Sequence, residues 1–591
     1  MTDYRIPTKE MEFVLNELVE IGGLTRLARF EDATKDVVEA IIEEAGKLAS
    51  EVLAPINQSG DQVGSQLDGT TVVTPPGFAE AYAQFVESDW LSLAQNPQYG
   101  GQGLPYTLHM AVSEMWNSAN LSFALNPMLT SGVIEAMEAH ASETLKQQYL
   151  PKLISGEWTG TMNLTEPQAG SDLSVLTTKA IPEGDHYLLT GQKIFITWGD
   201  HEMTDNVIQL VLARTPDAPP GNKGISLFLV PKYLLDDDGN PSQRNDVHTL
   251  SLEHKLGIHA SPTCVMSYGD NGGAVGYLVG ELYDGLSCMF KVMNHARLEV
   301  GLEGVGISER ACQKAVAYAK ERIQGRAPGH QDRVAIIEHS DVRRMLMLMR
   351  CLTEAARALT YVGAINYDYA AHGDGESDCK KARDRLEIFT PVIKGWCTEI
   401  AQEVTSLGIQ VHGGMGYVEE TGAAQYYRDA RITPIYEGTN GIQALDLIGR
   451  KLIRDEGLAM GSIYDEIEEA VRQLKSTQLH ELARMGEKLS DALVINREVT
   501  DAVLKNRHDP VHSGFAAFNY LMLTGTLFGA WQMARAALIA SDKLETDPVF
   551  YEMKTLSSLF FMNHVLPRSR VYQESILAGS AGLMGLSAER F

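Results

Sequence analysis

Cysteine is scarce in this sequence, and its spacing excludes the common cysteine-based sites. The 591 residues include six cysteines, and no two of them form a CxxC pair or another spacing typical of a metal site or a disulfide framework. Unpaired cysteines fit a reducing compartment. We therefore expect small, buried side chains at Cys264, Cys288, Cys312, Cys351, Cys379 and Cys397.

Positive charge is also in short supply. Lysine and arginine number 50 against 77 acidic residues, which gives a net charge of −27. A surface that binds nucleic acid needs clustered Lys and Arg to neutralise phosphates, so the composition argues against that class of partner. The acidic excess is better explained as the solvated surface of a globular protein.

The sequence shows no pattern of a targeting or membrane-spanning segment. The first residues, MTDYRIPTKEMEFVLNEL, lack the regions of a signal peptide and the arginine-rich pattern of a transit peptide, so we expect a cytoplasmic location of bacterial type. The most lipid-like stretch is Phe515 to Ala534, which Asn519 and Gln532 interrupt. It predicts a buried helix and not a membrane span.

A Rossmann fingerprint is missing as well, because no GxGxxG follows a predicted strand. Apolar residues recur at helical spacing up to about residue 157, including a helix over 32–53 that we expect Pro55 to end. From Trp158 to about Gly280, short β-type runs alternate with turns, and we interpret Asp236 to Gly239 as a hairpin loop. Helical spacing then returns. Helices and strands in separate blocks predict an α+β protein.

Two segments near the start of the β block carry groups that suit a flat, polar-edged ring. In Gly160 to Asp172, the hydroxyls of Thr165 and Ser171 can face such an edge, although a tight hydroxyl-rich turn explains the same residues. In GQKIFITWG, Phe195 can lie against a ring while Thr197 bonds its edge, and an ordinary strand is the alternative.

Two further segments lie in the second helical block. In QVHGGMGY, three glycines in four residues allow close approach to a phosphate, or form a plain helix connector. His412 has no partner at catalytic spacing, so we expect a structural role. In IYEGTN, Glu437 follows Ile435 and Tyr436, which would desolvate its carboxylate and make it a base. The alternative is a Glu that caps the helix before Ile442.

Taken together, these segments resemble the signatures of the acyl-CoA dehydrogenase family over about residues 30–450. TEPQAGSD and IYEGTN are the specific ones, and YGGQG, YLPKLISGE and KLGIHASPT also match. The additional C-terminal segment resembles the larger branch, which includes long-chain enzymes and the 3-methylmercaptopropionyl-CoA dehydrogenases. The family fold implies an N-terminal helical domain (1–157), a middle β-barrel-like domain (158–285), a four-helix bundle (286–452) and an extra helical domain (453–591).

The resemblance implies FAD as cofactor and no metal. Glu437 matches the catalytic base, and Ser171, Arg297 and Tyr436 match positions near the substrate. The residues that match FAD contacts are Met162, Leu164, Thr165, Ser171, Phe195, Thr197 and Thr439, with Arg322, Gln324, Gln410 and Gly414 reaching the partner's FAD across a homodimer interface. Met162 and Phe195 stand where many relatives carry Tyr and Trp, and both remain apolar neighbours for a flavin.

The implied reaction is α,β-dehydrogenation of an acyl-CoA in fatty acid β-oxidation or a related pathway, with an electron-transfer flavoprotein as acceptor. Dehydrogenation of 3-(methylthio)propanoyl-CoA, formed from dimethylsulfoniopropionate, is the alternative substrate reading. Two other classes stay open: an acyl-CoA oxidase that reduces O₂, and a non-catalytic acyl-CoA- or flavin-binding scaffold. Peripheral membrane contact by residues 453–591 is a separate open question.

Overall fold

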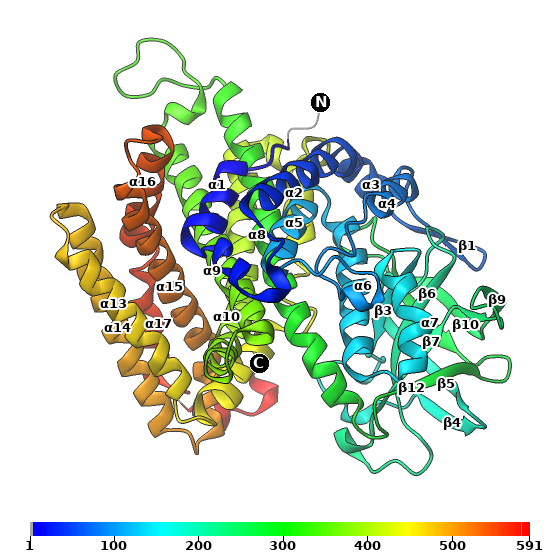
Figure 1. Cartoon of the computed structure of the whole chain (residues 1–591). Helices are drawn as coiled ribbons and strands as arrows, with labels where there is room; N and C mark the ends of the chain where they lie inside the picture. The colour runs from blue at the N-terminus through cyan, green and yellow to red at the C-terminus, as the bar shows by residue number, and fades with distance from the viewer. Residues whose placement is uncertain (1–3, 581) are drawn as a thin grey trace. The chain divides into compact units, whose positions relative to one another are not determined.

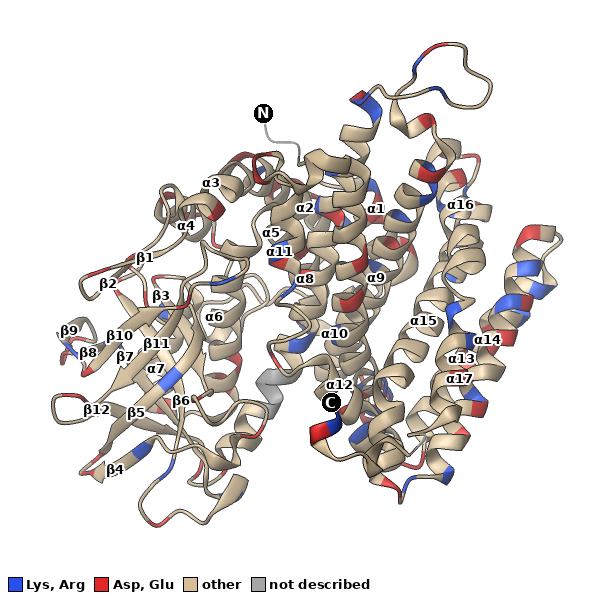
Figure 2. Ribbon diagram, turned by 180° about the vertical axis from the view of Figure 1, so that it is seen from behind, with Lys and Arg blue, Asp and Glu red and all other residues tan. Residues whose placement is uncertain are grey.

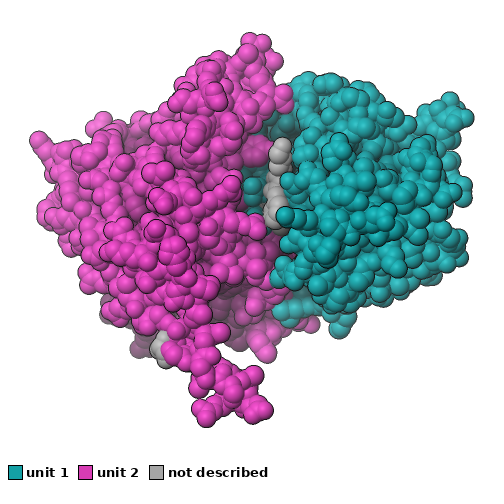
Figure 3. Space-filling view, turned by 90° about the horizontal axis from the view of Figure 1, so that it is seen from below, with its two compact units in different colours: residues 1–2, 40–299 teal, residues 3–39, 300–591 magenta. Residues whose placement is uncertain are grey.

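The computed structural model describes residues 4–580 and 582–591, with the backbone alone for residues 290–293. The chain forms two compact units, coloured separately in Figure 3. Unit 1 contains Ala40–Glu299, and unit 2 contains residues 4–39 and Val300–Phe591. This division is coarser than the four expected domains, whose boundaries stay a prediction.

Unit 1 begins with helices. They are α3 (Asn57–Val63), α4 (Phe78–Glu87), α5 (Tyr106–Ala119), α6 (Leu121–His140) and α7 (Glu143–Ile154), preceded by α2 (Lys35–Leu48), which starts in unit 2. The helix expected over 32–53 comprises α2 and a π-helical turn, Ala49–Leu53, and it ends before Pro55 as predicted. The chain continues through a 3₁₀ turn, Ala54–Ile56, into α3, because a proline fits the first turn of a helix, where its missing N–H is not needed.

A short hairpin interrupts this helical region. Strands β1 (Gln66–Asp68) and β2 (Thr71–Val73) pair antiparallel around Gly69, which has a φ of 62°. An Asp-Gly pair is typical of a hairpin turn, but the helical periodicity of the flanking residues led to a prediction of helix here.

An eight-stranded curled sheet forms the rest of unit 1 (Figure 1). Its order is β10-β11-β5-β12-β7-β6-β3, with β4 paired to β5, and only the β3–β6 pair is parallel among the described strands. The strands are β3 (Trp158–Asn163), β4 (Lys179–Glu183), β5 (His186–Thr197), β6 (Asn206–Ala213), β7 (Ser226–Pro231), β10 (Val247–Leu252), β11 (Thr263–Tyr268) and β12 (Ala274–Val279). The expected middle β domain is thereby confirmed, and β8 (Tyr233–Leu235) and β9 (Pro241–Arg244) form the expected hairpin around Asp236.

The centre of this sheet is buried on both faces. On β6, Leu210 belongs to the core shared with α6 and α7, while Val211 belongs to the core of the opposite face. Leu229 and Phe228 on β7 divide in the same way. Strands covered on both sides read as continuous apolar runs, which explains NVIQLVLA and SLFLVP.

Unit 2 is helical. It contains α1 (Thr8–Glu12), most of α8 (Gly285–Glu321), α9 (Ser340–His372), α10 (Glu376–His412), α11 (Ala423–Ala430), α12 (Asn440–Asp446), α13 (Leu458–Ser476), α14 (His480–Lys505), α15 (Pro510–Asp542), α16 (Pro548–His564) and α17 (Arg568–Ala578). Helices α13 and α14 carry both charge signs (Figure 2), as in the 2.8 Å ion pair of Arg497 with Glu468. The extra helical C-terminal segment is therefore confirmed.

Glycines bring the long helices of unit 2 together. A Cβ on Gly304 of α8 would lie 2.7 Å from the carbonyl oxygen of Cys397 on α10. On α15, a Cβ at Gly525 would lie 2.3 Å from the Trp396 ring of α10. Residues 515–534 form the middle of α15, most of which is buried. Within the described ranges, no helix combines the length and apolarity that crossing a membrane requires. The six cysteines are free, as expected; Cys312 and Cys379 are half-buried, and the other four are buried as predicted.

Candidate functional site

The turn that carries Glu437 lies in unit 2, just before α12. Glu437 is half-buried and adopts the left-handed conformation, with a φ of 55°. Thr439 is the N-cap of α12, since its hydroxyl accepts a 3.3 Å hydrogen bond from the N–H of Ile442. The cap is thus Thr439 and not Glu437, which removes the capping explanation for this carboxylate. A non-glycine residue in this conformation costs about 1–2 kcal/mol, and such strain gathers at functional sites.

Neighbouring side chains fix this turn from two directions. The buried amide of Gln443 donates 3.3 Å hydrogen bonds to the carbonyls of Glu437 and Gly438. The Tyr436 hydroxyl donates to the carboxylate of Glu303, a buried residue of α8. Burial, together with the charges of Glu303 and Glu437, holds the pKa of Tyr436 well above its usual value. Tyr436 therefore remains a protonated donor at neutral pH.

Asn440, the last residue of IYEGTN, ties the turn to α10. Its side-chain amide donates to the carbonyl of Gly395 at 3.2 Å and to Glu399 at 2.8 Å, and its side-chain oxygen accepts from the buried Lys394 at 2.8 Å. Neither Asn440, although it lies within IYEGTN, nor Lys394 was predicted to have a role. A lysine within an apolar helical stretch was the signal that could have pointed to a buried polar partner.

Unit 1 brings together a second group of predicted residues. The N–H of Ile194 donates to the carbonyl of Thr165 at 2.9 Å, and the Thr161 hydroxyl donates to the carbonyl of Thr197 at 2.8 Å. The end of β3 and the loop after it therefore run beside β5. Met162 and Leu164 lie on the same segment and pack partly against the core.

Phe195 is held outward by a β-bulge. Lys193 pairs with Met266 and Ile196 with Cys264, so two residues of β5 oppose a single residue of β11. Phe195 is one of the two; it has a φ of 59°, and the residue is 59% exposed. Bulges re-aim side chains next to functional sites. The bulge therefore leaves an exposed aromatic side chain on the strand that runs beside Thr165.

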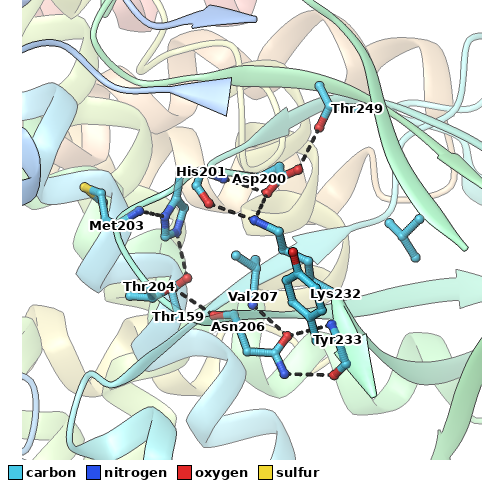
Figure 4. A network of polar contacts seen from close by, with 12 residues as sticks. Thr159, Asp200, His201, Met203, Thr204, Asn206, Val207, Lys232, Tyr233 and Thr249 are labelled. Carbon is cyan, nitrogen blue, oxygen red and sulfur yellow. Dashed lines mark hydrogen bonds and ion pairs between the residues drawn. The ribbon is translucent and has the colours of Figure 1, made fainter. Parts of the chain in front are cut away.

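A buried polar network anchors the turn that follows Thr197 (Figure 4). Asp200 forms a 2.6 Å ion pair with Lys232, whose ammonium also donates to the His201 carbonyl at 2.9 Å. The His201 ring accepts from the N–H of Met203 at 3.1 Å, so its other nitrogen donates to the Thr159 hydroxyl at 2.8 Å. Burial lowers the pKa of His201 to about 3, and the ring is neutral.

The residues predicted to reach a partner's FAD lie at the ends of two neighbouring helices of unit 2. Tyr318 of α8 stacks on His412 of α10 with ring centroids 4.4 Å apart. Arg322 and Gln324 follow Tyr318, and Gln410 and Gly414 flank His412; all four are exposed. His412 is buried and bonds to the Gly408 carbonyl at 2.7 Å, which confirms its structural role. In unit 1, Ser171 is exposed and Arg297 is buried on α8.

Unit 1 also contains a buried cluster of ionisable side chains that the sequence analysis did not identify. Glu299 of α8 lies 2.9 Å from His109 of α5 and 3.6 Å from His295, and the second nitrogen of His295 lies 3.1 Å from Glu135 of α6. Glu135 and Glu299 raise the pKa of His295 to about 10 against the effect of burial. Burial alone would raise the pKa of Glu299, but His109 and His295 hold it at about 2.

Four family models match the chain in succession. They are described as the N-terminal domain (residues 36–157), the middle domain (161–270) and the C-terminal domain (283–453) of acyl-CoA dehydrogenase, and as acetyl-CoA dehydrogenase C-terminal like (463–587). A 3-methylmercaptopropionyl-CoA dehydrogenase of Ruegeria pomeroyi is 45% identical over 95% of this chain and 96% of its own length. The broad-specificity linear acyl-CoA dehydrogenase FadE5 of Mycobacterium tuberculosis is 32% identical over the full length of both.

The fold has solved counterparts. ACDH-11 of Caenorhabditis elegans, in complex with C11-CoA, has a TM-score of 0.78 at 20% identity over 95% of this chain and 91% of its own. An acyl-CoA dehydrogenase of Bacillus anthracis, complexed with FAD, has a TM-score of 0.74 at 21% identity over 98% and 94%.

The chain belongs to the acyl-CoA dehydrogenase family. It is an oxidoreductase that acts on acyl-CoA with FAD as its cofactor, as the sequence predicted.

Proposed function

We propose that Glu437 is the base that removes the α-proton of the acyl thioester. The observation that carries this proposal is the strained turn: Glu437 is held at a φ of 55° by Gln443, by the Thr439 cap and by the Tyr436–Glu303 hydrogen bond. A half-buried carboxylate beside Tyr436 is less solvated than a surface glutamate, which favours its action as a base.

The α-proton goes to the carboxylate of Glu437, and a double bond forms between the α and β carbons, which gives the trans-2-enoyl-CoA. When bound, FAD accepts the β-hydrogen together with its electron pair. The backbone N–H of Glu437 donates to the thioester carbonyl and stabilises the charge that develops there.

Met162, Leu164, Thr165, Phe195 and Thr197 would hold the flavin, together with Ser171 and Thr439. The exposure of Phe195 on its bulge supports this set. Arg322, Gln324, Gln410 and Gly414 would contact the FAD of a second copy, since they are exposed at adjoining helix ends. Arginine suits a pyrophosphate because its planar donors pair two oxygens. Ser171, Arg297 and Tyr436 would bind the acyl-CoA.

Replacing Glu437 with Gln tests the base. The purified variant should keep bound FAD and its yellow colour, and its flavin absorbance should no longer bleach when acyl-CoA is added. Glu456→Gln is the matched control, because Glu456 also has a φ of 55° but lies in an exposed turn. The control should bleach as the wild type does. Bleaching of Glu437→Gln at the wild-type rate would overturn the proposal.

The substrate class proposed is a short acyl-CoA, with 3-methylmercaptopropionyl-CoA as the first candidate. The 45% identical relative bears that name, and a relative from Syntrophomonas wolfei that is 31% identical over 99% of both chains is named butyryl-CoA dehydrogenase. We expect kcat/KM to be higher for 3-methylmercaptopropionyl-CoA and butyryl-CoA than for hexadecanoyl-CoA. The reverse order would contradict this.

An electron-transfer flavoprotein is the proposed electron acceptor, in a homodimeric enzyme of the cytoplasm. Turnover in air should then depend on an added acceptor, and hydrogen peroxide should not accumulate in step with product. Peroxide release equal to turnover would instead identify an oxidase.

A further inference from the structure

A buried ion pair joins the two segments of unit 1 that carry the proposed flavin contacts. The ammonium of Lys193 on β5 lies 2.8 Å from the carboxylate of Glu166, which follows β3. The side chains are 0% and 1% exposed. Both residues lie within signature segments, GQKIFITWG and TEPQAGSD, and neither was predicted to have a role.

Glu166 joins the two ends of the loop that follows β3, because its carboxylate binds Thr177 and Thr178 at the far end of that loop. One carboxylate oxygen accepts from the N–H and the hydroxyl of Thr177, at 2.7 and 2.8 Å. The other accepts from the N–H and the hydroxyl of Thr178, at 3.0 and 2.6 Å. Lys193 in turn donates to the carbonyl of Leu164 at 3.0 Å. Both ends of the loop are thus fastened to one buried point.

The pair sits directly behind the proposed contacts. Glu166 is the next residue after Thr165, and Lys193 lies two residues before Phe195 on the bulged strand. The hydrogen bond from Ile194 to the Thr165 carbonyl joins the two segments at the same place. A shift of either charged side chain would therefore move Thr165 relative to Phe195.

Both members of the pair are charged at neutral pH. Burial alone would raise the pKa of Glu166, but Lys193 and the threonine hydrogen bonds lower it to about 2. Burial lowers the pKa of Lys193 to about 8 in spite of Glu166. A buried ion pair is a weak source of stability, because desolvation offsets the attraction and an uncharged replacement is often as stable. Because stability alone does not explain this ion pair, its position behind Thr165 and Phe195 points to a role other than stabilising the fold.

We propose that Glu166 and Lys193 are positioning residues that set the spacing of Thr165 and Phe195 around the flavin. The inference rests on the proposed flavin contacts, and it assigns to this pair the retention and orientation of FAD. Neither residue touches the reacting atoms in this account. The pair acts through the backbone of the loop and through the bulge of β5.

The test compares the holoenzymes of Glu166→Gln, Lys193→Met and the double variant. The measurements are the rate of FAD release on dilution, the circular dichroism of the bound flavin and the free energy of unfolding. Lys554→Met is the control, since Lys554 is also a buried lysine, 2% exposed, and forms ion pairs in unit 2 with Glu10 at 2.6 Å and Glu354 at 3.2 Å. It should lose stability and release FAD at the wild-type rate.

Each single variant should release FAD roughly tenfold faster, because a buried charge is left unpaired beside the site. The double variant removes both charges, so it distinguishes a loss of flavin positioning from a loss of protein stability. Its free energy of unfolding should return toward the wild-type value, while FAD release stays fast and the flavin circular dichroism stays changed. Wild-type FAD release in the double variant would overturn the inference.

A direct variant separates this result from a failure of the flavin contacts themselves. Phe195→Ala should change FAD release and the flavin circular dichroism. If it does and the pair variants do not, the positioning role alone is wrong. If Phe195→Ala also behaves as the wild type, the proposed contacts are wrong, and the inference is overturned with them.

Discussion

The hydroxyl of Tyr436 and the carboxylate of Glu303 are hydrogen-bonded across unit 2, which links the turn before α12 to α8. Glu303 is 1% exposed, and its partner is the residue directly before Glu437. The position of the proposed base is therefore coupled to a helix more than a hundred residues away in the sequence.

Breaking this hydrogen bond should impair both stability and turnover. Tyr436→Phe leaves the buried Glu303 carboxylate without this donor, which should destabilise the protein by about 1–3 kcal/mol. We expect kcat to fall more than KM rises, because the turn that positions Glu437 loosens. Glu303→Gln in the Tyr436→Phe background should recover part of the stability. Strictly additive effects in this double-mutant cycle would show that the two side chains are not coupled.

The left-handed turn at Glu437 should show its strain in the free energy of unfolding. Glycine adopts a positive φ without a steric penalty, so Glu437→Gly should be more stable than Glu437→Gln by about 0.5–1 kcal/mol, although both are inactive. Glu456→Gly, at the same φ of 55°, should gain about as much over Glu456→Gln and keep its activity. A glycine variant less stable than its glutamine counterpart would contradict a strained backbone.

The cluster around His295 should make stability depend on pH. The groups that face His295 are Glu135, Glu299 and the Tyr106 ring, and His109 shares Glu299. The folded-state pKa of His295, about 10, lies above the ordinary 6.5, so its contribution is fully present below pH 6.5 and is lost as the pH rises toward 10.

His295→Gln should therefore flatten the fall in the free energy of unfolding between about pH 7 and 10. Glu299 works in the opposite direction: its pKa of about 2 lies below the ordinary 4.5, so its contribution is lost as the pH falls from 4.5 toward 2. Chemical denaturation at a fixed FAD concentration measures both slopes. An alkaline slope identical in His295→Gln and wild type would exclude this assignment.

The contact of α15 with α10 should tolerate no side chain at Gly525. A Cβ there would lie 2.3 Å from the Trp396 ring, so Gly525→Ala should destabilise the protein by about 1–3 kcal/mol. Gly514→Ala is the matched control on the same helix, because its added Cβ meets no atom within 4 Å other than those of its chain neighbours and the surrounding helix backbone. It should be neutral or stabilising by up to about 1 kcal/mol. Equal thermal stability of the two variants would argue against this packing.

The sequence by itself determined the family, the α+β order and the cofactor, because these follow from local patterns. TEPQAGSD and IYEGTN are contiguous, and the change from helical to alternating periodicity at Trp158 coincides with the start of β3. One contiguous signal was missed: at Asp68-Gly69 a short hairpin interrupts the helices, although the residues on either side of it have helical periodicity.

Only the tertiary structure decided which side chains support the site. The pairs Glu303 with Tyr436, Glu166 with Lys193 and Lys394 with Asn440 join residues 133, 27 and 46 positions apart. A charged or polar residue in a sequence does not show which distant group will share its burial, because that depends on how helices and strands pack. Removing these groups from water strengthens their mutual interaction and makes the loss of either partner costly, and this removal happens only when the chain folds.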